Sequence, residues 1–130
     1  MNSKIKIETF EKNLEVISKA QAGDMLKFQR GLHSHWGIYT GNGEIIHRWD
    51  PNGDMSNAQV WKSKINDIMA YDGDLQIHNF LDDKKKPLPI SVIVEKAENA
   101  LGTKGYGLLD KNCEHFVTEC RYGQATSRQV

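Results

Sequence analysis

Two distant segments of the chain carry residues that could together perform nucleophilic catalysis. The front segment contains His35 and His47, and the back segment, Asn112-Cys113-Glu114-His115-Phe116, presents a thiol. A cysteine becomes a strong nucleophile when a nearby base takes its proton, and a histidine base needs a third group to orient its ring. We therefore interpret Cys113 as a nucleophile, His35 as its general base and His47 as the residue that orients His35.

The position of Cys113 favours a reactive thiol. The sequence predicts a helix from residue 113 to 121, which Asp110 or Asn112 can cap. Unpaired N–H groups and the positive dipole end of a first turn stabilise a thiolate. The alternative is a small buried core residue, and spacing alone does not decide between the two. Cys120 lies roughly 10 Å further along the helix, too far away for a disulfide, and is expected to be structural.

The other histidines are assigned no role in the chemistry. A lone strand histidine is often a hydrogen-bonded structural residue, which is the alternative for His35. His33 and His78 are expected to be solvated at a loop and a strand end. His115 follows Cys113 by two residues and therefore faces another side of the helix.

The register of one hairpin decides whether the two histidines can cooperate. Strands are predicted over 35–39 and 44–49, around the turn Gly41-Asn42-Gly43. A two-residue loop would place His35 and His47 on opposite faces of the sheet. A three-residue loop places Gly37 opposite His47, so that His35 lies on the same face one diagonal step away, roughly 7 Å off. Cooperation between the histidines therefore requires the odd-length loop.

A metal site is the competing use of the same side chains. His35, His47 and Cys113 could supply three zinc ligands, but the sequence contains no CxxC or HxxxH spacing and no cluster of carboxylates beside them. Glycine-rich phosphate loops are also absent, because the segment Gly41 to Gly43 has the pattern of a hairpin turn. We expect no metal and no cofactor.

The remaining pattern predicts an α+β fold with a small antiparallel sheet packed against helices. Expected helices cover 9–20, 90–101 and 113–121, with Gly102 and Gly123 ending the last two. Expected strands cover 25–29, 35–39, 44–49, 64–70 and 74–79.

The composition excludes several classes of protein. The chain has 130 residues, which fits one domain, and its 17 basic and 17 acidic residues leave no excess charge for nucleic acid. Two cysteines beside several histidines fit a reducing compartment. The charged N-terminus is not a secretory signal, and no apolar run reaches the ~18 residues of a membrane span. We expect a soluble, cytoplasmic protein.

Two motifs resemble those of a known family. HWGIYTGNGEIIH resembles the H-box, and NCEHFVTECRYG the NC motif, of the lecithin:retinol acyltransferase-like (LRAT-like) group, with the closer likeness to its phospholipase A and acyltransferase branch. The resemblance implies a permuted NlpC/P60-like (papain-like) architecture. It also matches Cys113 to the family nucleophile, His35 to the base and His47 to the third member.

The implied activity is thiol-dependent cleavage of glycerophospholipid esters, that is, phospholipase A1/A2 and acyltransferase activity without calcium or another metal. An acyl-cysteine intermediate would pass its acyl group to water, a lysolipid or an amine, and transfer to phosphatidylethanolamine would N-acylate it. Trp36, Tyr39 and Trp49 are candidates to line the acyl path, with core packing as their alternative. The implied partners are the lipid acyl donor, these acceptors and, peripherally, a membrane surface.

The chain departs from the family pattern in three places. His33-Ser34 replaces an aromatic-basic pair, and residues 1–21 form an N-terminal extension to the domain of residues 22–130. The sequence as given stops at Val130, before the hydrophobic C-terminal anchor that the resemblance implies, so we expect either a chain cut short of its anchor or a soluble protein. Such an anchor would make a cytoplasmic protein membrane-associated. The alternative function is a non-catalytic or weakly catalytic interaction module, as in some picornaviral proteins that carry the same motif pair.

Overall fold

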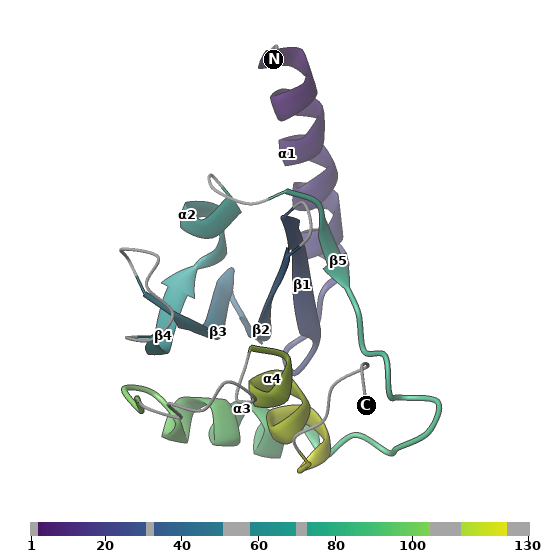
Figure 1. Cartoon of the computed structure of the whole chain (residues 1–130). Coiled ribbons are helices and arrows are strands. Elements are labelled where there is room, and N and C mark those ends of the chain that lie inside the picture. Colours follow the sequence, from purple (N-terminus) through teal and green to yellow (C-terminus); the bar gives the residue numbers. More distant parts are fainter. Residues whose placement is uncertain (1–2, 31–32, 51–57, 70–72, 105–112, 125–130) are drawn as a thin grey trace.

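The computed structural model describes residues 3–30, 33–50, 58–69, 73–104 and 113–124. Within these ranges the chain forms four helices and five strands (Figure 1). The helices are α1 (Ser3–Lys19), α2 (Ile65–Met69), α3 (Ile90–Asn99) and α4 (Cys113–Tyr122). The strands are β1 (Met25–Arg30), β2 (His33–Gly41), β3 (Glu44–Trp49), β4 (Gln59–Lys64) and β5 (Leu75–Ile77). The α+β class predicted from the sequence is confirmed.

All five strands form one antiparallel sheet in the order β4-β3-β2-β1-β5. The central strands β2 and β3 are rich in β-branched and aromatic residues, which fit a sheet covered on both faces. β4 is an edge strand with the sequence QVWKSK, and its lysines are typical of edges protected from further pairing.

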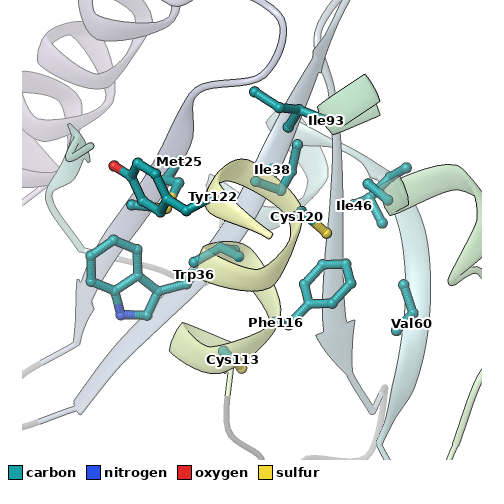
Figure 2. Packing of buried hydrophobic residues seen from close by; sticks show 12 residues of the cluster. Met25, Trp36, Ile38, Ile46, Val60, Ile93, Cys113, Phe116, Cys120 and Tyr122 are labelled. Carbon is teal, nitrogen blue, oxygen red and sulfur yellow. The ribbon is translucent and has the colours of Figure 1, made fainter. Parts of the chain in front are cut away.

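Helices cover both faces of this sheet. One buried cluster lies between the sheet and helices α3 and α4, and Figure 2 shows Phe116 and Cys120 of α4 packed against strand residues such as Ile38. A second cluster lies on the other face, where Leu26, Phe28 and Ile45 meet α1 and α2. Because side chains alternate between faces along a strand, β2 sends Trp36 and Ile38 to the first cluster and Tyr39 to the second.

The hairpin register is the one that cooperation between the histidines requires, but its cause differs from the prediction. Gly37 lies opposite His47. The connection is a two-residue turn of Asn42 and Gly43, with φ of 56° and 76°, as in type I′ hairpins. A shift of register between Tyr39 and Gly41 then adds the extra residue, so a β-bulge and not a three-residue loop sets the faces.

Several predicted elements needed correction. Residues 65–69 form α2 and not a strand, because Ile65 and Ile68, both buried, repeat at the spacing of a helical turn. β4 was missed, since its alternating lysines hide the strand pattern. β2 begins at His33, within the segment expected to be a loop, and α3 ends at Asn99, before the predicted residue 101. The expected caps Asp110 and Asn112 lie outside the described residues.

The N-terminal helix is longer than predicted and is attached differently. Phe10 and Leu14, which define its apolar spacing, are 42% and 41% exposed, whereas Asn13 is 2% exposed. The Asn13 side chain donates a hydrogen bond to the carbonyl of Gly73 and accepts one from the N–H of Leu75. A buried polar clamp on β5 therefore fixes α1 to the domain, since buried amides must keep their partners.

A second polar cluster fastens the C-terminal end of α4 to the loop that precedes α3. Arg121 makes two hydrogen bonds to the Asp82 carboxylate and donates another to the carbonyl of Gly23. Tyr122 donates to Asp82 as well, at 2.6 Å. Burial alone would raise the pKa of Asp82, but the hydrogen bonds from Arg121 and Tyr122 hold that pKa below its usual value.

Among the described residues, no helix combines the length and the apolar character needed to cross a bilayer.

Candidate active site

Cys113 and His35 come together in the folded protein, although 78 positions separate them. The Cys113 Sγ lies 3.7 Å from His35 Nδ1, within the range of a sulfur hydrogen bond. Cys113 is the first residue of α4, as the sequence predicted, and Figure 2 shows it at the end of that helix, at the margin of the buried cluster. Its side chain is 8% exposed and that of His35 is 5% exposed, so the pair is largely shielded from water.

The thiol lies where strands β2 and β3 separate. Among the described residues, the ladder between them ends with Gly37 opposite His47. β2 nevertheless stays paired with β1 as far as His33, and β3 with β4 as far as Trp49. Besides its contact with His35 of β2, the Cys113 thiol lies 3.6 Å from the carbonyl oxygen of Arg48, a residue of β3. Because the β2–β3 ladder ends there, Cys113, at the start of a helix on one face of the sheet, can contact His35, whose side chain belongs to the other face.

His47 contacts His35 directly. The distance from His35 Nε2 to His47 Nδ1 is 2.7 Å, and the two rings meet edge to face at 78°. His47 is fully buried. Its other ring nitrogen, Nε2, lies 2.9 Å from the hydroxyl of Ser63 on β4. Hydrogen-bond contacts thus connect Cys113, His35, His47 and Ser63 in one continuous row.

Ser63 was missed by the sequence reasoning because its strand was missed. The segment Gln59-Val60-Trp61 has the aromatic and β-branched residues of a strand, and recognising it would have placed Ser63 on the edge beside β3. In the structure Ser63 lies opposite Ile45, one diagonal step from His47.

The three aromatic candidates for substrate binding differ in position. Trp49 is half-buried and stacks on the His47 ring at 5.6 Å, so it lies beside the row of catalytic candidates. Trp36 is 2% exposed within the cluster under α4, and Tyr39 is 7% exposed, with its hydroxyl accepting a hydrogen bond from the N–H of Gly43. These two positions favour a packing role, and the predicted contact with substrate stays a prediction for all three.

Among the contacts described, Cys120, His78 and His115 take no part in this row. Cys120 is buried, and burial, with a smaller effect of Glu119, raises the pKa of its thiol to about 12. His78 is half-buried beside the rings of Trp36 and Phe80, whereas full solvation was expected. His115 is half-buried on α4. The His33 side chain lies outside the described part of the structure.

The geometry of the two histidines is not that of a shared metal site. Two nitrogens bound to one tetrahedral zinc ion are roughly 3.3 Å apart, whereas His35 Nε2 and His47 Nδ1 are in direct contact at 2.7 Å. Across the described residues, no group of three or more histidine, cysteine or acidic side chains is arranged to hold a metal ion.

A thiol at a helix start, an imidazole within reach of it and a second imidazole behind the first match the pattern of a known class of proteins. The profile of the lecithin retinol acyltransferase family matches residues 18–126, and the chain belongs to this family. Human phospholipase A and acyltransferase 3 is 36% identical over 126 residues, covering 88% of this chain and 78% of the relative.

Two further human relatives show a similar likeness. Phospholipase A and acyltransferase 4 is 32% identical over 121 residues, covering 83% of this chain and 73% of its own length. Phospholipase A and acyltransferase 1 is 34% identical over 120 residues, covering 83% of this chain and 71% of its own length. The antiparallel α+β sheet is consistent with the NlpC/P60-like architecture expected from the sequence motifs.

Proposed function

We propose that this protein is a cysteine phospholipase A1/A2 and acyltransferase that acts on glycerophospholipids. The observation that carries the proposal is the 3.7 Å contact between Cys113 Sγ and His35 Nδ1 at the start of α4. The relatives support it, since their names describe phospholipase A and acyltransferase proteins. Residues 22–130 would form the catalytic domain, with residues 1–21 as an extension.

In the acylation step His35 Nδ1 takes the thiol proton while Cys113 Sγ attacks the carbonyl carbon of an sn-1 or sn-2 ester. The tetrahedral intermediate carries a negative oxygen, which backbone N–H groups at the start of α4 would stabilise. His35 then gives its proton to the departing glycerol oxygen. The products are a lysophospholipid and a thioester on Cys113.

In the second step an acceptor attacks the thioester carbonyl and restores the thiol. Water gives a free fatty acid, a lysolipid hydroxyl gives a new ester, and the amine of phosphatidylethanolamine gives an N-acyl lipid. His35 removes the acceptor proton and returns it to the Cys113 sulfur. Thiol and imidazole supply both the nucleophile and the proton transfer, so the chemistry calls for no metal.

The test is product analysis of mixed micelles containing phosphatidylcholine with and without phosphatidylethanolamine. We expect lysophosphatidylcholine and fatty acid from the wild type, N-acyl phosphatidylethanolamine when the amine lipid is present, and neither from Cys113→Ala. Cys120→Ser is the matched control and should keep the activity, because Cys120 lies away from His35. Absence of both products from folded wild type would contradict the proposal and favour an interaction module.

A further inference from the structure

The side chain that continues the row of hydrogen-bond contacts beyond His47 is a serine on the edge strand. Ser63 Oγ lies 2.9 Å from His47 Nε2. Ser63 is half-buried and His47 is fully buried, so the contact joins a buried histidine to a residue at the margin of the core. We infer that Ser63 is a positioning residue, which sets the ring tautomers of His47 and His35 for proton transfer from Cys113.

The tautomers follow from the contacts, one nitrogen at a time. A neutral imidazole carries its proton on one nitrogen and accepts with the other. To accept the Cys113 proton, His35 Nδ1 must be bare, so its Nε2 carries the hydrogen and donates to His47 Nδ1. That nitrogen must then be bare as well, and His47 Nε2–H donates to the Ser63 hydroxyl. The opposite assignment, which begins with the Ser63 hydroxyl as donor to His47 Nε2, also pairs every contact, but it ends with a hydrogen on His35 Nδ1. Only the first assignment leaves His35 able to take the thiol proton.

Loss of the serine hydroxyl removes the acceptor that this arrangement gives to the His47 Nε2–H. Without the Ser63 hydroxyl as acceptor, the balance shifts toward His47 with its hydrogen on Nδ1, where it would face the N–H of His35. Two donors cannot share a hydrogen bond, so His35 would move its own hydrogen to Nδ1 and lose the lone pair that receives the thiol proton. A base in the wrong tautomer is inactive even when its position is unchanged.

The inference rests on the proposed thiol mechanism, but its first test does not depend on activity. Long-range ¹H–¹⁵N correlation spectra of protein labelled with ¹⁵N-histidine distinguish Nε2–H from Nδ1–H rings. We expect the wild type to show His35 and His47 as Nε2–H tautomers. Ser63→Ala should convert one or both to Nδ1–H, with backbone amide spectra unchanged elsewhere. An Nδ1–H ring at His35 in the wild type would overturn the inference.

Kinetics supply the second test. Ser63→Ala should lower the rate of acyl-enzyme formation at neutral pH by about 10- to 100-fold, while Ser63→Thr, which keeps the hydroxyl, should recover most of that rate. Ser18→Ala is the matched control, because the Ser18 hydroxyl is exposed and bonds only the carbonyl of Glu15 among the contacts described. Unchanged tautomers and rates in Ser63→Ala would refute the role of Ser63.

The two tests separate this inference from the proposed function. If the wild type forms no acyl-enzyme, the proposed function fails, and the spectra still decide whether Ser63 sets the tautomers. If the wild type is active and Ser63→Ala matches it in tautomers and rate, the role of Ser63 fails alone.

Discussion

His35 Nε2 and His47 Nδ1 lie 2.7 Å apart, so one imidazole is the direct hydrogen-bond partner of the other. The partner of a catalytic base is often a carboxylate, whose charge stabilises the imidazolium. A neutral histidine in that place can accept the same hydrogen bond with less electrostatic stabilisation of the charged base. His47 would therefore act mainly through orientation.

The first prediction separates orientation from charge at position 47. His47→Gln keeps an oxygen that can accept from His35 Nε2–H and should lower the rate of lysolipid release by less than about tenfold. His47→Leu has a similar size and no acceptor, and should lower it by about 10² or more. The measurement is kcat/KM with a soluble short-chain phospholipid, with the melting temperature of each variant as the check on folding. Equal losses of kcat/KM in the two variants would show that the hydrogen bond from His35 to residue 47 does not contribute to the rate.

The second prediction concerns the glycine opposite His47. A Cβ at Gly37 would lie 2.4 Å from Ile45 Cδ1 and 2.5 Å from Ile45 Cγ1, and Ile45 is fully buried. Gly37→Ala should lower the free energy of unfolding by about 1–3 kcal/mol, the usual cost of overpacking. Urea denaturation would measure this loss.

A double-mutant cycle isolates the cause of that loss. Ile45→Ala removes both contacting atoms and should itself cost about 2–5 kcal/mol. The double variant should be less destabilised than the sum of the two single changes, because the two shortest contacts no longer exist and only the Ile46 carbonyl oxygen, at 3.1 Å, stays close. Strict additivity would mean that the Ile45 side chain is not the obstacle.

The third prediction is a pH dependence of stability that comes from Asp82. Its pKa is held low in the folded protein by Arg121 and Tyr122, against the opposing effect of burial. A carboxyl whose folded pKa lies below its unfolded value of about 3.9 contributes stability that is present above that value. This contribution is lost as the pH falls through the folded pKa.

Removal of the Asp82 charge should therefore lower the free energy of unfolding at neutral pH but not in acid. Asp82→Asn should cost about 1–2 kcal/mol at pH 7, a figure kept low because the side chain is 39% exposed and partly screened. The difference from wild type should shrink as the pH falls below the unfolded pKa of about 3.9 and through the lower folded pKa. Asp83→Asn, at an exposed neighbouring position, is the control and should change stability little. If the stability loss of Asp82→Asn persisted undiminished in acid, it would contradict the account.

The sequence predicted the centre of the fold well and its edges poorly. Aromatic and β-branched runs on both sides of the Gly41-Asn42-Gly43 turn indicated the hairpin of β2 and β3, but they left two registers open, and the structure has the one that pairs Gly37 with His47. The bulge at Thr40 that produces this register has no distinct pattern of residue types. The edge strand β4 and the short helix α2 were missed because each buries only a few side chains, so polar residues dominate their patterns.

Some residues of the candidate site could be predicted from the sequence, and others are visible only in the fold. Cys113, His35 and His47 were recognisable because their residue types carry chemistry, and the structure brings all three together. Ser63 has a common residue type in an unrecognised strand, so only the fold shows its contact with His47. The clamp of Asn13 on β5 was unpredictable for a similar reason, because it joins positions about 60 residues apart.

Intact mass spectrometry of the protein incubated with a short-chain phosphatidylcholine tests the central claim most directly. A single acyl addition should appear on the wild type and on Cys120→Ser, and should be absent from Cys113→Ser. Rapid quenching in acid preserves the thioester if hydrolysis is fast. An adduct that persists in Cys113→Ser, or lysolipid release by that variant at the wild-type rate, would contradict the assignment of Cys113 as the nucleophile.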